Sequence, residues 1–138
     1  MIKDESIKAI FAEYEKAFAS LDFKKSAGFF ADIFISAGPR GVIAQSKAEF
    51  IKLANEAADF YRQVGQTSAK IISADETPIS NEYSMVKVHW GATFKKTRDI
   101  LIEFDVSYFI FRSVPEPKII MFIAHQDEQR AMRDLGLV

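Results

Sequence analysis

Apolar residues in the first half of the chain recur with the spacing of amphipathic helices. A long first helix is predicted because one helical face collects Ile7, Ile10, Phe11, Tyr14, Phe18 and Leu21. Asp22 is placed to cap a shorter second helix over residues 23–31. Ser46 and Glu49 have capping-box spacing, which predicts a third helix that starts there and ends before Gly65. A short hairpin is predicted between the second and third helices, with strands at residues 33–35 and 42–44.

From Gln66 onward the period changes to two, which indicates strands. Four segments follow, at residues 69–74, 83–95, 99–112 and 118–126, with breaks short enough for an antiparallel meander. Residues 127–135 can add a terminal helical turn or two. The pattern predicts an α+β fold in which residues 1–138 form a single domain, with an antiparallel sheet packed on three N-terminal helices.

The sheet segments differ in how apolar their two faces are. In the strand before Lys95, one face is dry, with Val86, Val88, Trp90, Ala92 and Phe94. The next strand carries aromatic residues on both faces, and the last strand is apolar on both. A second apolar face needs a cover, so we expect a homodimer through the outer face of the sheet.

Composition adds an unusual number of rings, since the chain has thirteen Phe, four Tyr and one Trp. Rings carry large apolar areas, so this content predicts a pocket for a small apolar or aromatic ligand.

The net charge of -1 gives no positive electrostatic field that would attract nucleic acid, so we expect no nucleic-acid partner. No apolar run is long enough for a membrane span and the N-terminus lacks a secretory pattern, so we expect a cytoplasmic protein. We expect no metal, because the two histidines are distant in sequence and the chain has no cysteine. We expect no cofactor, because the glycine-rich motif of dinucleotide-binding sites is absent.

The order of elements, the stretch Phe29-Phe30-Ala31-Asp32-Ile33-Phe34-Ile35 and a last strand at residues 119–122 carry a family resemblance. The chain resembles the nuclear transport factor 2-like superfamily, which includes ketosteroid isomerase, scytalone dehydratase and SnoaL-like polyketide cyclases. The resemblance implies a cystatin-like α+β roll, a cone-shaped sheet around a pocket that the helices close. Since this superfamily hosts enzymes, ligand binders and association modules, the resemblance implies a fold more than a function.

The isomerase residues carry over only in part. The tyrosine donor of that family falls on Tyr14, but the position of its aspartate base falls on Gly38, which has no side chain. The protonated acid of the family falls on Ser107. The resemblance therefore does not imply steroid isomerase activity. Scytalone dehydratase uses an Asp and a His pair inside its cone. By that resemblance His89 and His125 are candidate catalytic residues only if both point inward.

The remaining candidates for chemistry are Asp105 and His125 as base and Tyr14 as hydrogen-bond donor. Asp105 lies in a ring-rich strand where desolvation would favour a base, and the alternative is that it faces water or pairs across the dimer. Ligand contacts are expected from Tyr14, Phe30, Tyr61, Trp90, Ser107, Phe109 and Phe122. Cofactor-independent isomerase, dehydratase or cyclase chemistry fits these side chains. The alternative is a non-catalytic dimerisation or protein-association module, whose pocket is packed core.

Overall fold

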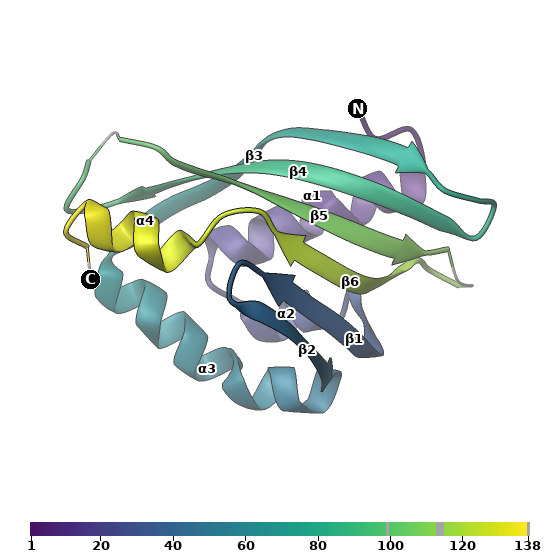
Figure 1. The fold of residues 1–138 in the computed structure, drawn as a ribbon, viewed down its shortest axis with the longest axis horizontal. Helices are drawn as coiled ribbons and strands as arrows, with labels where there is room; N and C mark the ends of the chain where they lie inside the picture. Colours follow the sequence, from purple (N-terminus) through teal and green to yellow (C-terminus); the bar gives the residue numbers. More distant parts are fainter. Residues whose placement is uncertain (99, 113–114, 138) are drawn as a thin grey trace.

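Six strands of the described residues, 1–98, 100–112 and 115–137, form one sheet in the computed structural model. The elements in chain order are α1 (Glu5–Ala19), α2 (Phe23–Ala27), β1 (Phe30–Gly38), β2 (Gly41–Ser46), α3 (Lys47–Val64), β3 (Gln66–Pro78), β4 (Tyr83–Phe94), β5 (Ile102–Phe111), β6 (Lys118–Ala124) and α4 (Glu128–Asp134) (Figure 1). The helices and strands therefore follow the predicted order, and the α+β fold is confirmed.

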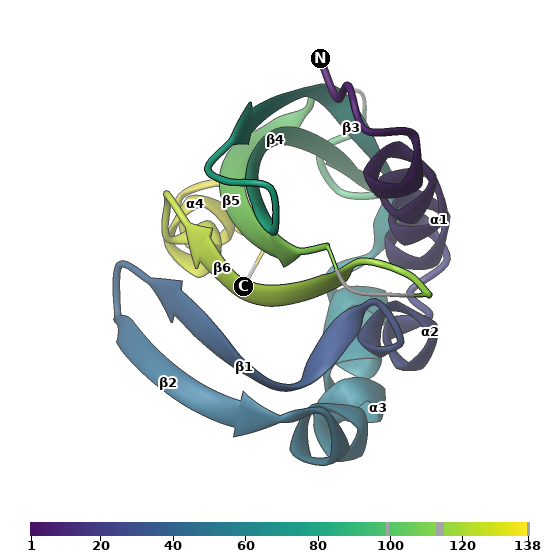
Figure 2. The same ribbon diagram turned by 90° about the vertical axis from the view of Figure 1, so that its right-hand side faces the viewer.

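The sheet is strongly curled and does not close on itself. Its strands run in the order β2-β1-β6-β5-β4-β3. All neighbours pair antiparallel except β1 and β6, which are parallel. Figure 2 shows the strands following an open arc, with α1, α2 and α3 along its open side. The arc and the helices thus enclose the concave side of the sheet.

The helix ends follow from local capping chemistry. Ser46 and Glu49 form the predicted capping box, with Glu49 N donating to Ser46 Oγ at 3.1 Å and Ser46 Oγ donating to Glu49 Oε1 at 3.0 Å. Gly65 ends α3 with φ of 83°, a left-handed conformation that glycine adopts without a steric cost.

Within the described residues, no helix combines the length and apolarity needed to cross a membrane.

Some boundaries differ from the sequence prediction. The second helix ends at Ala27, because Phe30 already pairs with Ile119 as part of β1. The strand expected at residues 69–74 extends over Gln66–Pro78, since it pairs with β4 along its length. The segment predicted at residues 99–112 is observed as Ile102–Phe111, while residue 99 lies outside the described residues.

The core lies on the concave side of the sheet. The predicted dry face of β4 is fully buried, with Val86, Val88, Trp90, Ala92 and Phe94 at most 1% exposed. Ile7 and Phe11 of α1 pack against this face in the same cluster. The alternation in β4 therefore fixes which side of the sheet the helices cover.

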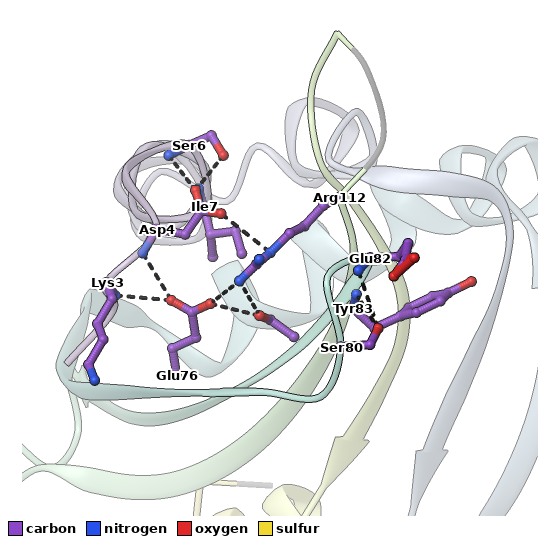
Figure 3. Close-up of polar contacts among 10 residues, drawn as sticks. Lys3, Asp4, Ser6, Ile7, Glu76, Ser80, Glu82, Tyr83 and Arg112 are labelled. Carbon is purple, nitrogen blue, oxygen red and sulfur yellow. Dashed lines mark hydrogen bonds and ion pairs between the residues drawn. The ribbon is translucent and has the colours of Figure 1, made fainter.

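Polar side chains fasten the N-terminal end of α1 to the sheet, in a group we call the N-terminal clasp: Asp4, Glu76, Ser84 and Arg112 (Figure 3). The Glu76 side chain is only 1% exposed and accepts from Arg112 Nη2 at 2.8 Å. Its other oxygen accepts from the backbone N–H groups of Lys3 and Asp4, both at 3.0 Å. Since Asp4 also caps α1, the clasp fixes the position of the helix that carries Tyr14.

Candidate functional site

A cavity of about 240 Å³ lies between the helices and the concave side of the sheet, and most of the side chains around it are aromatic. We call it the inner cavity. The helices contribute Tyr14, Phe18, Phe23, Ser26, Phe50, Ala57 and Tyr61. The sheet side contributes Trp90, Phe104, Asp105, Val106, Tyr108, Phe122, Ala124 and Gln126. Such a lining suits a small ligand with an apolar ring.

The periodicity of each helix and strand makes these aromatic side chains face the inner cavity. Tyr14 and Phe18 are one helical turn apart on the buried stripe of α1. Trp90, Tyr108 and Phe122 belong to the helix-facing sides of three adjacent strands, where Tyr108 is the cross-strand neighbour of Phe122. The ring centres of Tyr14 and Trp90 are 5.9 Å apart, and those of Tyr14 and Tyr108 are 5.7 Å apart.

A chain of hydrogen bonds connects these three residues. The Trp90 indole Nε1 donates to the Tyr108 hydroxyl at 3.1 Å, and Tyr108 is hydrogen-bonded to Tyr14 in turn. Burial raises the pKa of Tyr14 to about 12, although the hydrogen bond with Tyr108 partly offsets the effect. Tyr14 therefore keeps its proton across the physiological pH range and is a neutral donor inside the inner cavity.

Asp105 borders the inner cavity, but its carboxylate is engaged elsewhere. Oδ1 lies 2.8 Å from His89 Nδ1, its cross-strand neighbour, and Oδ2 accepts from Gln126 Nε2 at 3.2 Å. The bond to His89 lowers the pKa of Asp105. Bonds to Glu103 and then to Asp105 raise the pKa of His89, which favours the charged pair. A carboxylate held in this way is a weak base.

Four other candidates do not line the inner cavity. His125 Nε2 lies 2.7 Å from Ser107 Oγ, and neither residue lines the inner cavity. Phe109 is on the opposite side of β5 from Tyr108, because side chains alternate along a strand. Phe30 packs into the core against Phe34 and Phe50, with ring centres 4.5 Å and 5.7 Å away. Of the expected ligand contacts, Tyr14, Tyr61, Trp90 and Phe122 line the inner cavity.

Tyr108, Phe18 and Gln126 are cavity residues that the sequence analysis did not single out. A signal for Tyr108 was present, since it shares its parity with Ile102, Phe104, Val106 and Ile110, the more consistently apolar side of its strand. Gln126 carried no such signal. Its Oε1 accepts from Asp105 N at 2.7 Å, a contact that depends on how the chain leaves β6.

A second hollow of about 690 Å³, wider and more open to solvent, adjoins the first, and we call it the outer cavity. It lies beside the β1–β2 hairpin, whose residues Ser36 to Ile43 line it. Both cavities share Tyr61, Phe122, Ala124 and Gln126, a set we call the neck. At the rim, Arg40 Nε donates to Asp127 Oδ2 at 3.0 Å.

Within the part of the chain that the structure describes, no three His, Cys, Asp or Glu side chains are grouped as a metal ion would need.

Comparison with known proteins gives a family and a fold. The model of a family described as NTF2-like protein (DUF6841) matches residues 4–127. No sequence among curated proteins matches the chain.

Many solved structures share the fold at low sequence identity. An NTF2-like protein of unknown function from Shewanella oneidensis has a TM-score of 0.72 and 11% identity, covering 88% of this chain and 98% of its own. A putative aromatic ring hydroxylase from Novosphingobium aromaticivorans has a TM-score of 0.65 and 10% identity, with 87% and 85% covered. A putative calcium/calmodulin-dependent protein kinase II association domain from Xanthomonas campestris has a TM-score of 0.68 and 11% identity, with 92% and 89% covered. At such identities the likeness shows the fold alone.

Proposed function

This chain belongs to the NTF2-like protein family DUF6841, and on that premise we propose that it binds a small, mostly apolar cyclic ligand in the inner cavity. The observation that carries the proposal is Tyr14, a partly buried neutral phenol at the end of a hydrogen-bonded chain, set among aromatic rings. A ring would stack on the walls, and a carbonyl oxygen on that ring would accept from the Tyr14 hydroxyl.

The hydrogen-bonded chain favours an acceptor on the ligand. Because an indole N–H donates and does not accept, the Tyr108 oxygen is the acceptor of the Trp90 bond, and its own proton stays available for Tyr14. Bonds arranged in sequence polarise one another, so the Tyr14 hydroxyl becomes a better donor. A ring ketone or a related carbonyl compound matches this donor.

Binding is the function we propose first, ahead of acid/base catalysis. Isomerase, dehydratase or cyclase chemistry would need a base in the cavity, and Asp105 is the carboxylate that borders it. To act, Asp105 would have to give up its bonds to His89 and Gln126. Tyr14 is then the donor in either case, and His125 has no part.

The test uses two probes of the same shape, 1-tetralone and tetralin, which differ in the carbonyl oxygen. We expect calorimetric titration to show tetralone binding more tightly than tetralin. The Tyr14→Phe variant should weaken tetralone binding by about 1 kcal/mol, roughly fivefold in Kd, because one hydrogen bond is lost. Tetralin affinity should stay the same in this variant. Equal effects on both probes, or no binding of either, would contradict the proposal.

A second candidate function, self-association, is favoured by the outer face of the sheet. A row of apolar residues crosses five strands there in register, and we call it the outer apolar row: Ala44, Ile35, Met121, Phe109 and Met85. It contains no charged residue, and exposed apolar residues flank it, including Ile33 at 70% and Phe111 at 36% exposure. Such a face is the kind that a second copy of the chain covers in a homodimer.

A further inference from the structure

The size of the inner cavity limits what it holds alone. Its volume of about 240 Å³ lies below the roughly 300–1,000 Å³ of typical small-molecule sites. The outer cavity offers about 690 Å³ more and adjoins it at the neck. A ligand of ordinary size would therefore place one part in each cavity and pass between Tyr61 of α3 and Phe122 of β6.

The charges around the two cavities indicate the character of the second part. The charged side chains that line the outer cavity are Arg40 and Asp127, and they form an ion pair with each other. Asp127 has a second structural role, since its Oδ1 accepts from Arg130 N and caps α4. In the inner cavity, Asp105 is paired with His89. Opposite charges are thus already matched within the protein, and a charged ligand group would have to compete with the partner that each side chain already has.

The rest of the outer cavity is uncharged and partly apolar. Pro39, Val42 and Ile43 contribute apolar surface, while Ser36 and Gln126 contribute polar groups. Ile43 is 60% exposed, so contact with a ligand would remove apolar surface from water.

We infer that the ligand is an uncharged, elongated molecule of two parts, with a ring carbonyl in the inner cavity and a second uncharged group in the outer cavity against Ile43. The inference rests on the proposed function, since it takes the ring to occupy the inner cavity. It adds that the β1–β2 hairpin forms a second ligand-binding compartment, selective for length and against charge.

The experiment compares three probes by calorimetric titration: 1-tetralone, 6-benzyloxy-1-tetralone and 6-(4-carboxybenzyloxy)-1-tetralone. The benzyloxy probe should bind about tenfold more tightly than 1-tetralone, because its second ring covers apolar surface in the outer cavity. The carboxylate probe should lose most of that gain.

Two variants locate the effect. Ile43→Trp narrows the outer cavity and should abolish the gain from the benzyloxy group while leaving 1-tetralone affinity unchanged. Leu53→Trp adds the same indole at an exposed apolar site on α3 and should keep the gain, because Leu53 is 54% exposed and lines neither cavity.

The outcomes separate the two proposals. If 1-tetralone binds but the benzyloxy group adds nothing, or if the gain survives in Ile43→Trp, the two-part ligand is wrong and the proposed function stands. Tighter binding of the carboxylate probe than of the neutral one would overturn the charge selectivity. If no probe binds, the proposed function and this inference both fail.

Discussion

Tyr14 is a residue whose ionisation differs sharply between the folded and the unfolded chain. Its pKa rises from 10.0 to about 12 on folding, because burial disfavours the phenolate. The neutral phenol therefore contributes stability that is present below pH 10 and is lost as the pH rises from 10 towards 12.

We expect this shift to be visible in a spectroscopic titration. The tyrosinate absorbance of the wild-type protein minus that of Tyr14→Phe should stay near zero at pH 10, where an unperturbed tyrosine is half ionised, and should grow only as the pH approaches 12. Tyr83→Phe is the control, since Tyr83 is 40% exposed. A Tyr14 signal already half complete at pH 10 would show that the phenol is in contact with water.

Glu76 makes a second prediction at this scale. Burial alone would raise the pKa of Glu76, but bonds from Ser84, from the backbone of Asp4 and Lys3, and from Arg112 lower it to about 2. Compared with 4.5 in the unfolded chain, this shift corresponds to about 3 kcal/mol. A depressed carboxyl pKa gives stability that is present above pH 4.5 and is lost as the pH falls towards 2.

Urea unfolding of Glu76→Gln tests the N-terminal clasp. We expect a loss of about 3 kcal/mol at pH 7, because Arg112 and two backbone donors lose a carboxylate partner. The difference from wild type should shrink as the pH falls from 4.5 towards 2. Glu82→Gln, at an exposed glutamate of the β3–β4 hairpin, should change stability by less than about 0.5 kcal/mol. A loss that persists unchanged in acid would point to packing rather than charge.

At the scale of elements, local periodicity was enough to predict the helices and most strands. The capping box at Ser46 and Glu49 and the left-handed Gly65 set the limits of α3 through contacts within a few residues. The limits of α2 and β3 could not be predicted in this way. They depend on Phe30 pairing with Ile119 and on β3 pairing with β4. The spacing of apolar residues along one strand does not identify the strand it pairs with.

The candidate site shows the same division. Tyr14 and Trp90 lie on one-sided apolar patterns, so their inward direction followed from the sequence. Asp105, Ser107 and Phe109 lie in a strand with rings on both sides, and only the pairing of His89 with Asp105 shows that this parity is opposite to that of Trp90. Asp105 nevertheless borders the inner cavity, whereas Ser107 and Phe109 do not. The family resemblance placed Ser107 at a catalytic position, yet the inner cavity uses its neighbour Tyr108.

At the scale of the whole molecule, the outer apolar row predicts a homodimer. Light scattering of the purified protein should give the mass of two chains at micromolar concentration. Phe109→Lys, within the row, should give the mass of one chain, because a lysine there would be buried without a partner. Leu53→Lys on α3 is the control and should remain a dimer. A wild-type protein with the mass of a single chain would refute this expectation.

The parallel pairing of β1 with β6 has a consequence for how the protein is made. Strand β1 is synthesised early, but its neighbour β6 spans residues Lys118–Ala124 and leaves the ribosome much later. Until then the hairpin has no sheet to join, and Phe30 and Phe34 lack part of the core that buries them. Contacts so distant in sequence slow folding, so the nascent chain passes through a stage at which these rings are open to chaperones.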